Sequence, residues 1–341
     1  MTKKDRQLII GSILFTVLLI EVILQFFAID RFDFRSVKLE SDPVPTLQIP
    51  NSSDFRSQRN RNGKLIYRFE HSYDEFGRRK TPKISSAKEA HLFFGGSFVY
   101  GDGLKEEQTL PWVFSDLTGI QTYNYAYIAF GPNNVLAQIN ENNINDQVPQ
   151  NIESIDASFF SYYFHIERYT GSFGWIGKQR TNDPYFKIIN GKLTRLGNFT
   201  THRPVLTTFY WLLWKIKLLR LFMQKLDNSF NTDNQKLLCS IINESFLKLK
   251  TQLKDRLNNF NFIIGPYNHV YQPAKALNDY YNGVKKCLDP KIKVYEIDPP
   301  EDFFSNRRLY QVHPEDTHPS ALANEFLTIK MMELIYPETN K

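Results

Sequence analysis

From residue 90 onward, short apolar runs alternate with segments of helical period, and few folds accommodate this pattern. Short apolar runs bounded by turn residues predict buried strands, and apolar residues that recur every three or four positions predict helices. Their alternation predicts a parallel sheet covered by helices, which is the α/β class. The expected strands are 90–94, 122–126, 157–164, 262–266 and 293–297. The expected helices are 109–117, 132–141, 237–257 and 321–335.

Ahead of this region, the segment 8–29 is almost entirely apolar, with Glu21 and Gln25 as its only strongly polar residues. About 20 helical residues cross the roughly 30 Å hydrocarbon core of a bilayer. A cleavable signal peptide is the alternative, but its apolar part usually has only about 7 to 15 residues. We therefore expect one uncleaved transmembrane helix, preceded by a cytoplasmic tail over 1–7. Basic residues flank the span on both sides, so their distribution does not set the orientation. Because a short tail stays most easily in the cytoplasm, we expect the rest of the chain to be extracytoplasmic.

The remaining chain divides by composition. Residues 30–88 are polar and interrupted by prolines, which predicts a juxtamembrane linker and a lead-in to one domain over 89–338. Within it, an insertion around 183–235 contains a hairpin-like turn at 190–192 and an apolar, aromatic helix over 205–223. That helix either covers the site, touches the bilayer surface, or packs internally, and we favour internal packing.

The charge and cysteine content exclude several classes. The net charge of +6 is spread along the chain among acidic residues, so no nucleic-acid partner is expected. The two cysteines, Cys239 and Cys287, can form one bridge if the domain is extracytoplasmic, and otherwise are two buried thiols, the interpretation we favour. Neither a CxxC pair nor an HxxxH helix occurs, so the sequence predicts no metal site.

Two segments far apart in sequence carry the elements of nucleophilic catalysis. Ser97 follows an expected strand and two glycines, and His318 precedes an expected helix. A nucleophilic serine needs a base, a group that orients the base, and hydrogen-bond donors for the oxyanion. We expect Ser97 as nucleophile, His318 as base, Glu315 or Asp316 as the orienting acid, and amides of Ser97 and the loop 124–132 as oxyanion donors.

The order of these segments resembles that of the SGNH, or GDSL-like, hydrolase superfamily. The similar blocks are 93–103 with 108–111, then 123–132, then 316–320, and 73–78 resembles a lead-in found in membrane-anchored bacterial members. The resemblance spans about 90–332. It implies a flavodoxin-like, three-layer α/β/α sandwich, an esterase, lipase or acyltransferase activity, and no metal or organic cofactor.

Three departures from the family pattern affect the expected site. The family acid usually lies three residues before the histidine, which is Glu315 here, although Asp316 is slightly favoured. The glycine that donates its amide corresponds to a position near Ala129, with Gly131 two residues on. Asn124 begins the same block and is a further oxyanion or substrate-binding candidate.

The third departure concerns the family's oxyanion asparagine. It is absent from 162–168, where His165 is the candidate substitute, since a neutral imidazole donates one hydrogen bond.

The sequence therefore predicts a membrane-anchored serine esterase that removes an acyl group, such as O-acetyl, from an extracytoplasmic ester, for example an acylated glycan. Two alternatives stay open. One is a polysaccharide O-acyltransferase with the same nucleophile, and the other is an inactive glycan-binding or assembly protein.

Overall fold

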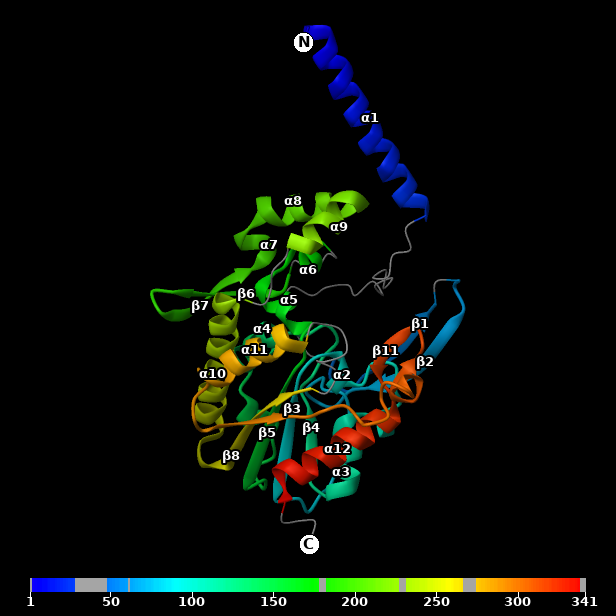
Figure 1. Cartoon of the computed structure of the whole chain (residues 1–341). Coiled ribbons are helices and arrows are strands. Elements are labelled where there is room, and N and C mark those ends of the chain that lie inside the picture. The colour runs from blue at the N-terminus through cyan, green and yellow to red at the C-terminus, as the bar shows by residue number, and fades with distance from the viewer. Residues whose placement is uncertain are drawn as a thin grey trace.

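The central feature of the molecule is a five-stranded parallel sheet (Figure 1). The computed structural model describes residues 2–27, 48–60, 62–177, 182–226, 231–265 and 274–337. The sheet consists of β3 (Glu89–Phe94), β4 (Gln121–Asn124), β5 (Ser154–Ser161), β8 (Leu257–Ile264) and β9 (Ile292–Glu296). Their spatial order is β4-β3-β5-β8-β9, which is the flavodoxin-like order when the five strands are counted along the chain. The predicted α/β class with a parallel sheet is confirmed.

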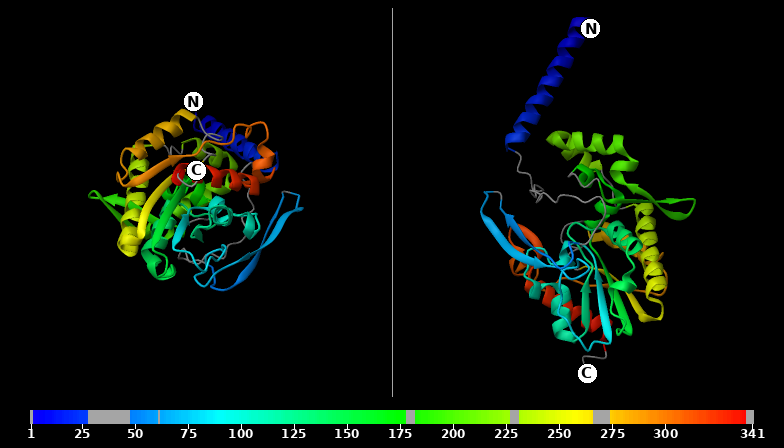
Figure 2. Two further views of the ribbon diagram at one scale, coloured as in Figure 1. Left: turned by 90° about the horizontal axis from the view of Figure 1, so that it is seen from below. Right: turned by 180° about the vertical axis from the view of Figure 1, so that it is seen from behind.

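Helices cover both faces of the sheet and form three layers (Figure 2). One face carries α3 (Leu110–Thr118) and α12 (Ala321–Ile335), and the other carries α4 (Pro132–Glu141), α10 (Thr232–Leu253) and α11 (Ala274–Lys285). Successive side chains of β3 serve opposite faces: Leu92 and Phe94 lie in one core, and Phe93 lies in the other. Strands buried on both sides read as continuous apolar runs, which is why the sequence pattern located them.

The lead-in packs against the domain. Strands β1 (Ser53–Arg59) and β2 (Leu65–Ser72) form an antiparallel hairpin. Downstream, Arg79 is 1% exposed and donates to the carbonyl groups of Tyr100, Gly101 and Leu104. Because these carbonyls belong to the segment that follows Ser97, the lead-in supports the neighbourhood of the site. Residues 30–47 of the linker and lead-in predicted over 30–88 lie outside the described residues.

The insertion begins with the predicted hairpin, formed by β6 (Pro184–Ile189) and β7 (Lys192–Asn198). Its turn residues Asn190 and Gly191 have φ angles of 50° and 76°, as the tight turns preferred in hairpins require. Short α7 (Phe199–His202) follows.

The single helix expected over 205–223 is wrong, because the chain forms α8 (Pro204–Lys215) and α9 (Lys217–Leu226) instead. Ile216 between them is extended, with φ −95° and ψ 107°. The carboxylate of Glu21 accepts the backbone N–H groups of Lys217 and Leu218 at 2.7 and 2.8 Å. This carboxylate caps the new helix and stabilises the break.

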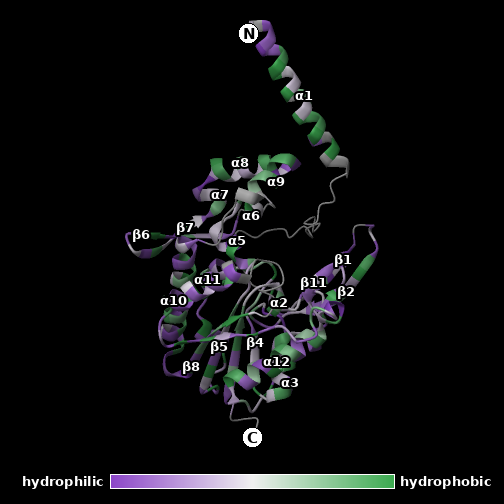
Figure 3. Cartoon of the chain, in the orientation of Figure 1, coloured by the Kyte–Doolittle hydropathy of each residue, from purple (hydrophilic) through white to green (hydrophobic). Residues whose placement is uncertain are grey.

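Helix α1 (Lys3–Phe27) covers most of the predicted membrane span, whose last two residues lie outside the described part. In Figures 1 and 3, α1 lies at the same end of the molecule as α8 and α9, and all three carry hydrophobic residues. Among the helices of the described residues, none has the length and apolar character that crossing a membrane requires. The predicted transmembrane anchor is therefore not supported.

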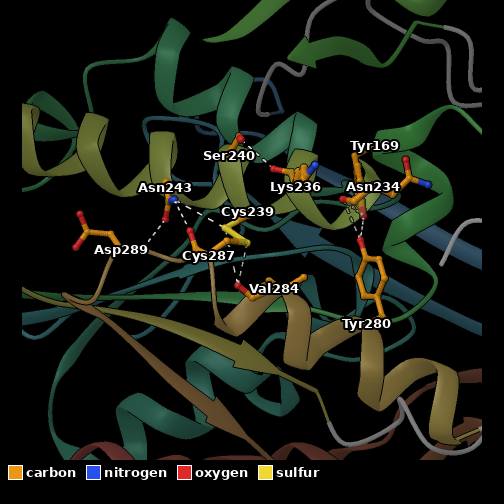
Figure 4. The surroundings of a disulfide bond; sticks show 10 residues. All are labelled: Tyr169, Asn234, Lys236, Cys239, Ser240, Asn243, Tyr280, Val284, Cys287 and Asp289. Carbon is orange, nitrogen blue, oxygen red and sulfur yellow. Dashed lines mark hydrogen bonds between the residues drawn. A yellow bond between two sulfur atoms is a disulfide. The ribbon is translucent and has the colours of Figure 1, made fainter. Parts of the chain in front are cut away.

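Cys239 and Cys287 form a disulfide, so the favoured interpretation as two thiols is wrong (Figure 4). The bond joins α10 to the segment after α11, with a Cα–Cα distance of 6.0 Å. Asn243 lies beside it, donating to the Cys287 carbonyl at 3.1 Å and accepting from the Asp289 N–H at 2.8 Å. Helical contacts between α10 and α11 bring the two cysteines together, and such tertiary contacts are not visible in the sequence pattern.

Candidate active site

Ser97 lies just past the carboxyl end of β3, as the first residue of the short helix α2 (Ser97–Tyr100). Its side chain is buried, at 5% exposure. A Cβ on Gly96 would lie 2.9 Å from each of Arg168 Nη1, His165 Nε2 and the Phe130 carbonyl oxygen. Gly96 itself has φ −96° and ψ −159°, which other residues adopt. Glycine is thus required here for the close approach of its neighbours and not for its backbone conformation.

His318 connects Ser97 to a buried carboxylate. It belongs to β11 (Asp316–Pro319), which pairs with β10 (Gln311–His313) directly before α12. Its Nε2 lies 2.9 Å from Ser97 Oγ, and its Nδ1 lies 2.5 Å from Asp316 Oδ1. The same oxygen accepts the His318 backbone N–H at 3.0 Å. These contacts align a hydroxyl, an imidazole and a carboxylate in one hydrogen-bonded chain, called here the Ser97 chain.

The two candidate acids occupy different environments. Asp316 is fully buried against His318, whereas Glu315 is exposed, and its backbone N–H donates to His313 Nδ1 at 3.1 Å. Glu315 lies in the turn between β10 and β11, whereas Asp316 and His318 are alternate residues of β11 and lie on the same face of the strand. The geometry joins Asp316, and not Glu315, to the Ser97 chain.

The charges of the pair shift both pKa values. Burial alone lowers the pKa of His318, but the adjacent Asp316 carboxylate and its hydrogen bond raise it above its ordinary value, with a further contribution from Asp102. Burial raises the pKa of Asp316, yet the charge and hydrogen bonds of His318 lower it below its ordinary value. Asp316 therefore stays ionised at neutral pH and favours the protonated imidazole that forms when His318 accepts a proton.

A second carboxylate, which the sequence analysis did not single out, faces the same imidazole. Asp102 Oδ2 lies 3.9 Å from His318 Nε2. Asp102 also accepts a hydrogen bond from the hydroxyl of Tyr67 in β2 at 3.5 Å. The backbone N–H of Asp102 donates to the Ser97 carbonyl at 3.1 Å, so the turn after α2 directs this residue toward the nucleophile. Its place in the 93–103 block was the only sequence signal for it.

The loop after β4 approaches the nucleophile, and its two predicted amide donors differ. The Gly131 N–H already donates to Asn134 Oδ1 at 3.0 Å, within the first turn of α4. The N–H groups of Ser97 and Ala129 make no hydrogen bond within the described residues. Ala129 has a φ angle of 65°, a left-handed conformation that costs a non-glycine residue about 1–2 kcal/mol. Of the two loop amides, that of Ala129 is the one free to bind an oxyanion.

Asn124 contributes to the shape of the loop. Its Nδ2 donates to the Tyr100 carbonyl at 3.4 Å, and its Oδ1 accepts the Ala126 N–H at 3.1 Å. Both polar ends of this buried side chain are therefore engaged by backbone groups. These contacts indicate that Asn124 positions the loop. They do not leave a polar group of this side chain for the substrate contact that the sequence analysis allowed.

His165 begins α5 (His165–Thr170), just beyond β5, and is 1% exposed. Its Nδ1 accepts the Tyr162 N–H at 3.4 Å, which leaves the ring proton on Nε2. Burial, reinforced by the charge of Arg168, lowers the pKa of His165 well below its ordinary value, so the ring is neutral. Its Nε2 is buried beside Gly96 and has no hydrogen-bond partner among the described residues. The N–H donor of His165 thus lies beside the residue that precedes Ser97 and has no acceptor there, which is the arrangement that an oxyanion contact requires.

Arg168 links His165 to the loop. Its guanidinium donates to the Phe130 carbonyl at 2.5 Å and lies 4.9 Å from the ring of Phe164 and 5.0 Å from that of Trp175. The carbonyl that it binds belongs to the residue after Ala129. Arg168 therefore holds the loop in the conformation that exposes the Ala129 amide.

Comparisons with known proteins add little beyond the fold. No protein-family model matches the chain, and no curated protein sequence matches it. Three similar solved structures are a lipase, Lip_vut3, from a goat rumen metagenome, an acetyl xylan esterase, Est2A, from the rumen bacterium Butyrivibrio proteoclasticus, and the salicylyl-acyltransferase SsfX3 from a tetracycline biosynthetic pathway.

The lipase shares 14% identity over 72% of this chain and 96% of its own, with a TM-score of 0.40. The esterase shares 11% identity over 83% of this chain and 86% of its own, with a TM-score of 0.37. The acyltransferase shares 13% identity over 89% of this chain and 76% of its own, with a TM-score of 0.39. Similarities this low carry no argument about the activity of this chain, which rests on the geometry above.

Proposed function

We propose that this protein is a serine hydrolase that cleaves an oxygen ester through Ser97, His318 and Asp316. The observation that carries the proposal is the Ser97 chain, in which 2.9 and 2.5 Å contacts join the three side chains in the order that proton transfer needs. The neutral form of His318 has a proton on Nδ1, which Asp316 accepts, and a free Nε2 toward Ser97. That tautomer is the one a general base needs.

In the proposed acylation, Ser97 Oγ forms a bond to the ester carbonyl carbon while its proton moves to His318 Nε2. The carbonyl electron pair moves to the oxygen, and the resulting oxyanion accepts hydrogen bonds from the Ser97 and Ala129 amides and from His165 Nε2. The tetrahedral intermediate then expels the alcohol, which receives the proton from His318. Asp316 remains ionised throughout and stabilises the imidazolium.

In deacylation, His318 removes a proton from a water molecule, whose oxygen attacks the acyl carbon. The carboxylic acid leaves, and Ser97 recovers its proton. A sugar hydroxyl in place of this water would make the same acyl-enzyme an acyltransferase, so the acceptor distinguishes the two activities.

The test is hydrolysis of p-nitrophenyl acetate and of longer-chain p-nitrophenyl esters by the full chain and by Ser97→Ala. We expect turnover by the wild type, none above background by the variant, and a preference that identifies the acyl length. A trapped acyl-enzyme with no hydrolysis, released by added glycan, would assign transfer. The absence of both turnover and acyl-enzyme would contradict the proposal and leave a binding role.

The proposed substrate class is an acylated hydroxyl, with a carbohydrate O-acetyl ester as the smallest case, because the sequence resemblance implies such esters. The proposed compartment is extracytoplasmic. The Cys239–Cys287 disulfide supports it, since structural disulfides persist mainly in oxidising compartments.

A further inference from the structure

Helix α8 is apolar on two opposite faces, and the residues that the structure describes cover one of them. The inner face packs on α6 (Phe173–Gly177): the ring of Phe173 lies 5.3 Å from Tyr210 and 5.6 Å from Trp214. Trp214 also lies against Gly177, where a Cβ would come within 2.7 Å of the indole. This face fixes α8 to the domain and determines which residues point outward.

The outer face belongs to a stripe of four apolar residues: Val205, Phe209 and Leu212 in α8, and Ile216 directly after the end of the helix. Their spacing of three or four residues places them along one side of the helix. They are 83%, 51%, 51% and 40% exposed. A contiguous apolar stripe in water is costly, and such surfaces usually mark an interaction site.

Basic residues lie at both ends of α8 and in α9. Between 199 and 223 the sequence contains Arg203, Lys215, Lys217 and Arg220 but no Asp or Glu. Lys215 Nζ lies 5.1 Å from the ring of Trp211, which is 37% exposed. An apolar stripe bordered by tryptophan and cationic side chains complements the acyl chains and anionic headgroups of a bilayer surface. A protein partner that covered this surface would have to supply acidic residues to pair with the buried cations.

The surface continues onto α1 and α9. The Glu21 carboxylate holds the first N–H groups of α9, so α1 contacts the helix pair at this point. Leu221 and Phe222 of α9 are 46% and 58% exposed, and Leu18 of α1 is 63% exposed. Figure 3 shows hydrophobic residues on all three helices at this end of the molecule.

We propose that the outer face of α8 and α9 lies on an anionic lipid bilayer, with Trp211 at the level of the headgroups and the basic side chains toward lipid phosphates. Helix α5, which begins with His165, follows β5, and α6 follows α5 and packs on α8. The interaction holds the carboxyl edge of the sheet, where Ser97 lies, toward the membrane.

The decisive test is quenching of tryptophan fluorescence in the full chain by vesicles of equimolar phosphatidylcholine and phosphatidylglycerol with brominated acyl chains. We expect quenching that disappears in Trp211→Phe, whereas Trp112, Trp175 and Trp214 remain in that variant. Binding without Trp211-dependent quenching would overturn the proposal, because another part of the protein would then contact the lipid. Absence of binding would also overturn it.

Two paired variants separate the apolar and charged contributions. Phe209→Ser with Leu212→Ser should weaken vesicle binding or Trp211 quenching at least about tenfold, and Leu247→Ser, exposed in α10, is the matched control that should leave both unchanged. Lys215→Gln with Arg220→Gln should reduce binding to the anionic vesicles about fivefold per charge, and pure phosphatidylcholine should show no such difference. If the Phe209 and Leu212 substitutions instead dissociate a dimer in sedimentation, the stripe is a contact between copies and the proposal fails.

Discussion

Two histidines of this protein each connect a serine hydroxyl to a carboxylate, yet they lie in different parts of the fold. His318 belongs to the Ser97 chain at the carboxyl edge of the sheet. His91 lies within β3, where its Nε2 is 2.7 Å from Ser158 Oγ and its Nδ1 is 2.9 Å from the hydroxyl of Tyr336. That hydroxyl donates to Asp156 at 2.9 Å. We call these four residues the His91 network.

The difference between the two clusters lies in the position of the carboxylate and in access to solvent. Asp316 contacts His318 directly and raises its pKa. Burial lowers the pKa of His91 to about 4, and the charge of Asp156, which lies beyond the intervening Tyr336, opposes this only in part. The His91 side chain is fully buried, and the His318 side chain is 16% exposed. Similar residue types therefore make a base that can exchange a proton in one place and a neutral structural link in the other.

The largest expected difference between the Ser97 chain and the His91 network is in the effect of replacing the serine of each, Ser97 or Ser158, on activity. Ser97→Ala should lower kcat/KM for a p-nitrophenyl ester at least about 10⁴-fold, because the nucleophile is lost. Ser158→Ala should keep the activity but lower the free energy of unfolding by about 1–3 kcal/mol, because His91 Nε2 loses its buried donor. Ester kinetics and urea unfolding measure the two effects. A folded Ser158→Ala variant with a comparable loss of activity would remove the distinction.

The two carboxylates should differ in the pH dependence of activity. Because Asp316 raises the pKa of His318, the acid limb of kcat/KM should have its midpoint above pH 6.5, and activity should rise as His318 loses its proton. Asp316→Asn should move this midpoint to lower pH and reduce kcat by about 10³ to 10⁴-fold. Asp156→Asn is the control and should leave the midpoint in place. Equal midpoints in the wild type and Asp316→Asn would refute the assigned acid.

A third comparison concerns the buried donor at the site. His165→Phe should reduce kcat by about 10² to 10³-fold with little change in KM, because an oxyanion donor acts mainly in the transition state. His165→Gln retains an N–H donor and should recover part of the loss. In contrast, His91→Phe should leave kcat unchanged when kcat is calculated from the concentration of folded protein. A loss for His165→Phe confined to KM would instead indicate a ground-state contact.

The smallest expected effect is on stability against pH. The folded pKa of His91 is about 4 and its ordinary value is 6.5, so the unfolded chain binds more protons between these values. Stability should therefore fall by about 3 kcal/mol as the pH decreases through this window. Urea unfolding at pH 7 and pH 4 measures the fall, which should be smaller in His91→Leu. His318 has the opposite sign, because its stabilisation is lost as the pH rises through its elevated pKa.

The sequence predicted the parts of the site that follow from local pattern. Ser97 follows a continuous apolar strand, and His318 precedes a helix with regular apolar spacing, so both could be located. The sequence favoured Asp316 over Glu315 only slightly, because the choice depends on where β11 begins: Asp316 shares a face of the strand with His318, and Glu315 lies in the turn before it. The contribution of Asp102 depends on a turn that brings it back to His318 after α2.

Long-range contacts account for the remaining differences. The Cys239–Cys287 bond depends on how α10 packs against α11, and the break at Ile216 depends on a carboxylate from α1. The disagreement about the 8–29 segment is of another kind, since its composition predicted a span that the described helices do not support. Hydrophobic periodicity and composition indicate where helices and strands form, whereas tertiary packing determines which of them contact one another.

The most direct test of the central claim is covalent labelling of the full chain with a fluorophosphonate, followed by peptide mass spectrometry. The account predicts one adduct on Ser97, formed faster as the pH rises through the His318 pKa, absent from Ser97→Ala and unchanged in Ser158→Ala. A folded wild-type protein without an adduct, or with its adduct on another serine, would contradict the assignment of Ser97 as a nucleophile activated by His318.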